Sequence, residues 1–232
     1  MVSHPYYPLD LELPGYVENT IDLTTLLLAF SAGVACILGT ALIAAHRYRP
    51  SISKHDQFLV LWFVLSGSLH CFFEAYFLWN HTRMPAVGDL FGQLWKEYAK
   101  SDSRYMTADP LVLTLEIITV FVWGPLSFLT AWSIMSDSPF RFPFQALVAT
   151  GHLYSCTLYF VMAFIDMTRG VIHSRPEKLY FWVYFVAMNA PWIVVPAFTL
   201  YQAITGSARA VTTTRESTAR SRVSGSAKEH TL

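Results

Sequence analysis

Five long apolar stretches set the strongest limit on what this sequence can fold into. Lipid offers no hydrogen-bond partner to an open backbone, so a chain that crosses a bilayer core about 30 Å thick needs roughly 20 apolar residues per helix. The stretches predict spans over residues 23–45, 57–79, 111–134, 143–165 and 179–204. We therefore predict an all-α integral membrane bundle of five transmembrane helices.

The rest of the chain divides around this membrane domain, which we place at residues 23–205. Residues 1–22 carry acids but no Lys or Arg, and they lack the basic start and cleavage site of a signal peptide. Basic residues follow the first span and the last, which places the N-terminus in the lumen and the C-terminus in the cytoplasm, although the loops 83–104 and 169–178 are also basic. Residues 206–232 are rich in Ser, Thr, Arg and Gly and are predicted to be a disordered cytoplasmic tail.

Composition agrees with a chain whose surroundings are membrane lipid. It is 53% hydrophobic and only 14% charged, with a formal net charge of zero, so nucleic-acid binding is not expected. Cys36, Cys71 and Cys156 each lie in an apolar run without a CxxC or Cys/His pattern, which argues against disulfides and a structural zinc site. Nucleotide-loop, zinc-hydrolase and serine-hydrolase motifs are missing as well, and no cofactor is predicted.

The loop between the second and third spans contains a helical pattern. Apolar residues recur at a spacing of three and four, with charged residues on the other faces. The apolar set is Val87, Leu90, Phe91, Leu94, Trp95 and Tyr98, and the charged set is Lys96, Glu97 and Lys100. We interpret this segment as a short interfacial helix, with an ordinary loop as the alternative.

Ionisable side chains inside the second and third spans need an explanation, because a charge at mid-membrane costs at least about 3 kcal/mol on insertion scales. His70 and Glu74 are four residues apart, which places them on one helix face within hydrogen-bonding reach. Glu116 lies in the next span, with Thr119 on the same face. A lone Glu or His also serves to tie two helices together, but three ionisable groups are more than packing requires.

The fourth and fifth spans add further polar groups. His152 has no carboxyl nearby in sequence, and we interpret it as structural. Asn189 and Trp192 bracket Pro191, which lacks an N–H and is expected to kink that turn. A tryptophan in a membrane helix is more often a packing residue or an interfacial anchor, but its ring face also attracts a cation.

If these groups meet in one cavity, their residue types indicate the kind of reaction that the cavity supports. Two carboxyls in a dry pocket favour the neutral acid form of at least one of them, and a nearby imidazole can relay a proton. An acid, a base and an aromatic cation stabiliser together indicate addition and removal of a proton through a carbocation.

Four strings, in order along residues 58–200, resemble the emopamil-binding-protein family of sterol isomerases in the EXPERA superfamily. They are SLHCFFEAYF (68–77), LWKEYAKSDSRY (94–105), EIITVFVWGPLS (116–127) and YFWVYFVAMNAPW (180–192). The resemblance implies a multi-pass protein of the endoplasmic reticulum membrane or nuclear envelope, with a lateral sterol-sized cavity in the bundle. It further implies a homodimer that shifts a sterol double bond from Δ8 to Δ7 without a cofactor, as a step of cholesterol-type biosynthesis, and that binds cationic amphiphilic amines.

Transferred residue by residue, the family's catalytic positions fall on His70, Glu74 and Glu116. Its substrate- or cation-binding positions fall on Thr119, Asn189 and Trp192. The implied mechanism is protonation at C9, a carbocation at C8 and loss of a proton from C7, with the donor and the acceptor unassigned among the first three residues.

The loop string also matches the family, and we interpret it as a lid or a structural brace in which Glu97, Asp102 and Arg104 pair with one another. Its remaining matched residues are Trp95, Tyr98 and Tyr105. The sequence departs from the family pattern at Ser101, where glycine is expected, and at Pro191, where vertebrate members have leucine.

The main alternative is a non-enzymatic membrane protein of the same superfamily that binds sterols and cationic amphiphiles. A binder needs an apolar cavity and one carboxylate for an amine, but not the full polar set, so the sequence favours the enzyme. A small ion transporter is disfavoured because the five spans show neither inverted repeats nor a second set of buried charges.

Overall fold

All regular structure is helical in the part of the chain that the computed structural model describes, residues 4–229. Five helical rods in it are long and apolar enough to cross a membrane. They are Leu23–Tyr48, Lys54–Asn80, Pro110–Met135, Arg141–Thr168 and Leu179–Arg220. The prediction of an all-α five-helix membrane protein is confirmed.

The second and third rods each change helix type near the middle. The second consists of α2 (Lys54–Ser68), the π-helical segment η1 (Leu69–Glu74) and α3 (Ala75–Asn80). The third consists of α5 (Pro110–Ile118), the π-helical segment η4 (Thr119–Trp123) and α6 (Gly124–Met135). A π-helical turn widens the helix locally and is frequent at functional sites.

The first and fourth rods are uninterrupted α-helices, α1 (Leu23–Tyr48) and α7 (Arg141–Thr168). The fifth begins as a π-helical segment, η5 (Leu179–Ala187), and resumes as α8 (Pro191–Glu229) after a turn at Ala190. Pro191 is the first residue of α8, so the helical ladder breaks where its missing N–H was expected to break it.

Side-chain caps define where several helices begin. The Asp22 carboxylate accepts the Thr25 N–H at the start of α1, and the Ser53 hydroxyl accepts the Asp56 N–H at the start of α2. Asp109 caps α5 in the same way, directly before Pro110. Each cap satisfies an amide that the first turn leaves without a partner.

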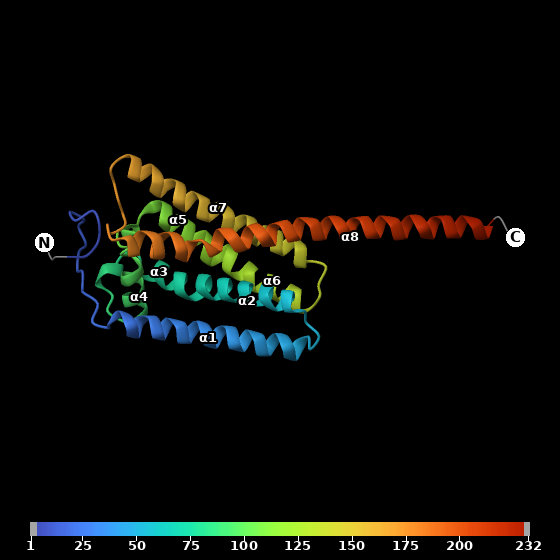
Figure 1. Cartoon of the computed structure of the whole chain (residues 1–232), viewed down its shortest axis with the longest axis horizontal. Coiled ribbons are helices and arrows are strands. Elements are labelled where there is room, and N and C mark those ends of the chain that lie inside the picture. The colour runs from blue at the N-terminus through green and yellow to red at the C-terminus, as the bar shows by residue number, and fades with distance from the viewer. Residues whose placement is uncertain (1–3, 230–232) are drawn as a thin grey trace.

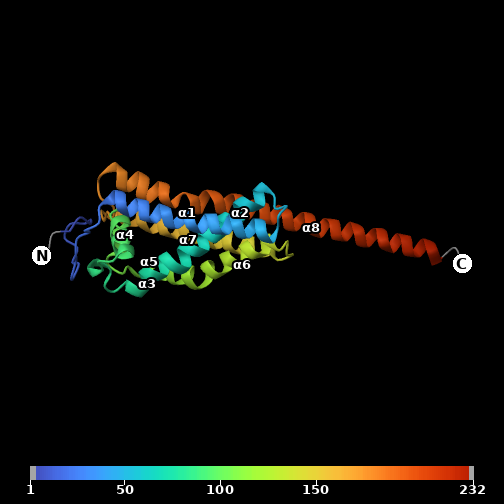
Figure 2. The same ribbon diagram turned by 90° about the horizontal axis from the view of Figure 1, so that it is seen from below.

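The rods pack in pairs, α7 against α8 and α2 against α6, while α1 lies along one edge of the bundle against α2 and α4 (Figure 1). Helix α4 (Leu90–Tyr98) and the N-terminal segment lie together at one end in both views (Figures 1 and 2). We call this the N-end and the opposite end, where α2 begins and α6 meets α7, the far end.

Two hydrophobic clusters occupy the two ends. The N-end cluster is half aromatic and contains Tyr6, Leu13, Phe77, Met84, Trp95, Ala99, Tyr105, Met106, Val112, Tyr159, Ala163 and Phe185. The far-end cluster is mostly aliphatic and contains Ala45, Ile52, Leu59, Val60, Trp62, Phe63, Ala131, Ile134 and Val148.

The N-terminal segment packs onto α4 through polar contacts. The side-chain oxygen of Gln93 accepts the N–H groups of Thr20 and Ile21, and Lys96 donates to the Val17 carbonyl oxygen at 2.6 Å. The helix predicted in this loop is present, but Lys96 and Glu97, which the sequence places on faces other than the apolar one, are also buried, against this segment and the bundle. The charged face is therefore a packing face, because the N-terminal segment covers it.

The tail differs from the prediction of disorder over residues 206–232. As far as Glu229 it continues α8 beyond the bundle (Figure 1). Alanine and arginine favour a helix, and threonine hydroxyls such as those of Thr212 and Thr213 donate to carbonyls four residues earlier. The helix already formed by the span supplies the nucleus that an isolated tail would lack. Residues 230–232, at the end of the predicted tail, lie outside the described part of the chain, as do residues 1–3 at the start of the predicted N-terminal segment.

Candidate active site

A cavity of about 370 Å³ opens between the two clusters, within the size range of small-molecule sites. All five rods and α4 contribute to its wall. All six site residues predicted from the sequence line this cavity, namely His70, Glu74, Glu116, Thr119, Asn189 and Trp192. The wall is otherwise mostly apolar, so the polar groups are concentrated in a few places.

The pair on the second rod lies within η1. His70 Nδ1 is 2.7 Å from Glu74 Oε2, and His70 is buried. Gly124 of the facing rod permits this position, because a Cβ there would lie 2.5 Å from Cys71 Sγ and 3.1 Å from His70 Cβ. The facing glycine thus lets the second rod approach the third rod closely at His70 and Cys71.

The third rod supplies the second carboxyl. Glu116 is buried just before η4, and Tyr105 donates its hydroxyl hydrogen to Glu116 Oε1 at 3.0 Å. Burial first, and the neighbouring Glu116 second, raise the pKa of Tyr105 well above its ordinary value, so the phenol stays a neutral donor. The Glu74 and Glu116 side chains, from the second and third rods, line the same cavity.

His152 also belongs to this group, although the sequence indicated only a structural role. Its Nε2 lies 3.1 Å from His70 Nε2, and the two rings meet edge to face with centroids 5.1 Å apart. It is buried, and its Nδ1 has no hydrogen-bond partner within the described residues. Contact with His70 depends on how α7 packs against the second rod, which no local pattern reveals.

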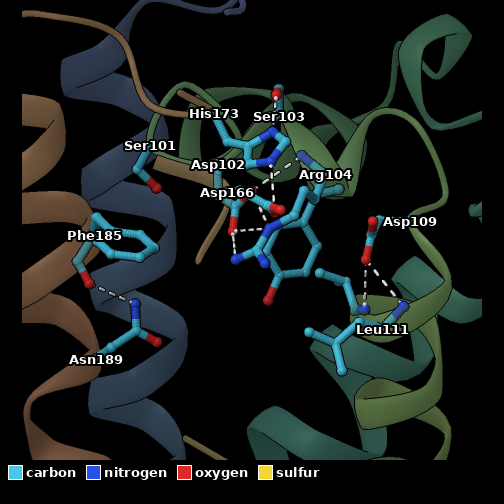
Figure 3. A network of polar contacts seen from close by, with 12 residues as sticks. Ser101, Asp102, Ser103, Arg104, Asp109, Leu111, Asp166, His173, Phe185 and Asn189 are labelled. Atoms are coloured by element: carbon cyan, nitrogen blue, oxygen red, sulfur yellow. Dashed lines mark hydrogen bonds and ion pairs between the residues drawn. The ribbon is translucent and has the colours of Figure 1, made fainter. Parts of the chain in front are cut away.

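The remaining nominated residues surround these groups. Asn189 donates to the Tyr98 hydroxyl at 3.0 Å and to the Phe185 carbonyl oxygen at 2.8 Å, the second of which is drawn in Figure 3. The Thr119 hydroxyl donates to the Leu115 carbonyl oxygen of its own helix. Asn189 thus ties the fifth rod to α4.

Trp192 stands at the far-end side of the cavity. Its ring centroid is 6.4 Å from that of His70 and 5.6 Å from that of Trp62, which packs behind it. Within the described part of the chain its indole N–H has no partner. A ring held this way by a second indole presents a surface to the cavity beside the histidines.

The loop before the third rod acts as a brace. Asp102 and Arg104 form a bidentate pair, with Arg104 Nη2 2.7 Å from Asp102 Oδ2, and both are buried (Figure 3). Burial alone would lower the pKa of Arg104, but hydrogen bonds to the Asp102 carboxylate raise it. The guanidinium stacks 4.8 Å from the ring of Tyr159. This pair fixes the backbone from which Tyr105 reaches Glu116.

Glu97 does not join that pair, contrary to the sequence interpretation. It binds Lys100 at 2.6 Å and accepts a 3.5 Å contact from the Tyr184 hydroxyl. Together with Leu23 it also lines a second, more polar hollow of about 560 Å³ under the N-terminal segment. Glu97 therefore lies between the membrane cavity and the N-end surface.

Comparisons with known proteins agree with this geometry. A sequence model of the EXPERA family (EXPanded EBP superfamily) matches residues 90–203. The chain is 34% identical to the 3-beta-hydroxysteroid-Delta(8),Delta(7)-isomerase of Rattus norvegicus, over 87% of each chain. It is 32% identical to a probable isomerase of that name in Oryza sativa subsp. japonica, over 83% of this chain and 87% of the relative. A protoglabretal synthase of Ailanthus altissima is 29% identical over 85% of this chain and 89% of its own.

Proposed function

Because this chain belongs to the EXPERA family, we propose that it is a membrane isomerase that moves a sterol ring double bond from Δ8 to Δ7. The observation that carries the proposal is the meeting of two carboxyls, Glu116 buried and Glu74 partly buried, each with its own hydrogen-bonding partner, in one apolar cavity. The substrate is a 3β-hydroxysterol, the class that the names of the relatives specify.

The two carboxyls have different partners, and this difference assigns their roles. His70 can offer an N–H to Glu74, which favours a charged carboxylate there. Glu116 accepts a hydrogen bond from the neutral phenol of Tyr105 and shares its cavity with Glu74, and two negative charges in one apolar cavity repel each other. We assign Glu116 as the general acid and Glu74, oriented by His70, as the general base.

The reaction then moves protons only. The electrons of the C8–C9 double bond take the proton of Glu116 at C9, which leaves a carbocation at C8 and a Glu116 carboxylate. Glu74 removes a proton from C7, and the C7–H electrons form the C7–C8 double bond. Transfer of this proton from Glu74 to the adjacent Glu116 restores the starting state.

The intermediate is a cation, and the part of the cavity wall beside the two histidines can stabilise a positive charge. The face of Trp192 attracts positive charge in a site without water, and Thr119 and Asn189 complete the polar part of the pocket that holds the substrate. A cationic amphiphilic amine would mimic the carbocation, so such amines are expected to bind as inhibitors.

Position in the cell follows from the same proposal. We place the chain in the endoplasmic reticulum membrane or nuclear envelope as a homodimer, with residues 1–22 in the lumen and the C-terminus in the cytoplasm, the side on which basic flanks are favoured. Protease protection of a tag at each end in sealed microsomes tests the orientation. Crosslinking in the same microsomes tests the dimer.

The deciding experiment is complementation of cells that lack sterol isomerase, with sterols measured by mass spectrometry. Wild type is expected to convert Δ8 to Δ7 sterol, and Glu74→Gln and Glu116→Gln are each expected to reduce turnover by about 10²- to 10⁴-fold. Glu177→Gln, an exposed carboxyl away from the cavity, is the matched control and keeps wild-type turnover.

The same experiment separates the enzyme from a binder. A wild-type chain that inserts into the membrane and leaves Δ8 sterol unchanged would indicate a protein that binds sterols and amines. Full activity in both Gln variants would remove the carboxyls from the mechanism.

A further inference from the structure

We propose that His152 is a positioning residue that keeps the hydrogen of His70 on Nδ1, where it serves Glu74. The inference rests on the proposed isomerase function and adds a third member to the His70–Glu74 pair. Three side chains from two rods form one chain of contacts, in which Glu74 Oε2, His70 Nδ1, His70 Nε2 and His152 Nε2 follow one another at 2.7 Å and 3.1 Å.

A neutral imidazole carries one N–H, so the two contacts of His70 cannot both use its own hydrogen. With the hydrogen on Nε2, His70 would present a lone pair to Glu74, which only a protonated Glu74 could satisfy. With the hydrogen on Nδ1, His70 donates to a Glu74 carboxylate, and its Nε2 needs a donor. His152 Nε2–H is the donor at that position.

His152 therefore selects between two states of its neighbour. In the selected state Glu74 is ready to accept a proton and the imidazole ring is held from both sides. Outer partners of this kind fix the tautomer and the orientation of a functional histidine at other sites.

The unpartnered nitrogen of His152 supports a role beyond packing. Once its Nε2 carries the hydrogen, Nδ1 is left as an acceptor without a partner within the described residues, in a side chain that is only 3% exposed. A histidine retained for packing alone would be expected to have both nitrogens satisfied. Among the described residues, the side chain of His152 instead makes a single hydrogen-bonding contact, and its partner is the imidazole of His70.

Two variants at this position separate hydrogen bonding from packing. His152→Gln keeps an N–H donor of similar reach, whereas His152→Leu keeps bulk without a donor. In steady-state assays on Δ8 sterol, His152→Leu is expected to lower kcat by about 10- to 100-fold with KM unchanged, as seen for outer partners elsewhere. His152→Gln is expected to stay within about threefold of wild type, since one neutral hydrogen bond replaces another.

A spectroscopic measurement tests the inference independently of enzyme activity. Ring ¹⁵N NMR of histidine-labelled full-length protein in detergent is expected to show His70 as the Nδ1–H tautomer in wild type and in His152→Gln, and as a mixture in His152→Leu. Thermal unfolding of the three proteins reports whether each is folded.

Several results would overturn the inference. They are an Nε2–H tautomer of His70 in wild type, full kcat in a folded His152→Leu, or a His152→Gln protein as impaired as His152→Leu. If wild type shows no isomerase activity, the proposed function fails, yet the His70 tautomers of the three proteins still decide the role of His152.

Discussion

The two ends of the bundle are held together by different means, although the same rods run through both. At the far end, mostly aliphatic side chains, such as Ala45, Ala131 and Val148, fill the space between helices. At the N-end, aromatic rings share the interior with buried charged groups, of which Lys96 binds the Val17 carbonyl oxygen and Arg104 packs on the ring of Tyr159. The cavity lies where one kind of packing gives way to the other.

Breaking an ion pair at each end should give the largest difference. Arg104→Ala leaves Asp102 charged and buried without its partner, which is expected to cost about 3–5 kcal/mol. Arg141→Ala at the far end removes a partner of Asp56, but Arg49 remains 3.7 Å from the same carboxylate. Thermal unfolding in detergent should show the loss at Arg104 well above that at Arg141. Equal losses would mean that the two ends are braced alike.

Glycine substitutions compare close packing on the two sides. A Cβ at Gly151 would lie 2.5 Å from the ring of Trp123, which lines the cavity, and one at Gly67 would lie 3.0 Å from the ring of Phe128, which does not. Overpacking costs about 1–3 kcal/mol. Gly151→Ala is expected to weaken amine binding as well as stability, because Trp123 must move. Gly67→Ala should affect stability alone, and a calorimetric titration with an amine ligand distinguishes the two.

The two stacked tryptophans sharpen the comparison further. Trp192 lines the cavity, whereas Trp62 packs behind it. Trp192→Leu is expected to lower kcat by about 2- to 30-fold, the equivalent of about 0.5–2 kcal/mol of cation–π stabilisation, while Trp192→Phe retains part of it. Trp62→Phe should leave kcat unchanged. Sterol turnover at saturating substrate is the measurement, and equal losses at both positions would indicate packing alone.

A pH titration should reveal the smallest effect. Burial lowers the pKa of Lys96, and the nearby Asp89 opposes that change. As the pH rises through the folded-state pKa, folded Lys96 releases its proton before the unfolded chain does, near about 10.4, so the free energy of unfolding increases over that window. Unfolding midpoints measured from neutral to alkaline pH should rise in wild type and stay flatter in Lys96→Met. Parallel curves would remove Lys96 as the source.

The membrane helices and much of the candidate site could be predicted from the sequence, and the reason is physical. Apolar length alone specifies membrane helices, and ionisable groups inside such helices are rare enough that His70, Glu74 and Glu116 stand out. All three line one cavity. The free-energy cost of an ionisable side chain in a membrane helix can be recognised from the sequence of that helix alone.

The features that the sequence did not predict depend on contacts between residues that are distant in sequence. Lys96 is buried because the N-terminal segment folds over it, and His152 meets His70 from another rod. Tyr105 reaches Glu116 from a loop whose conformation the Asp102–Arg104 pair sets. The α-helical spacing used for His70 and Glu74 also assumed a regular helix, whereas both lie in a π-helical turn.

The π-helical turns have a consequence for how this chain tolerates changes in length. Each closes its hydrogen bonds one residue further along than an α-helix does, so η1 and η4 each accommodate a residue more than a regular rod between the same ends would hold. Deleting Phe72 would let the second rod become a regular helix with both ends in place, but His70 and Glu74 would then be three residues apart. An alignment gap at this point would therefore mark a change of chemistry rather than a change of fold.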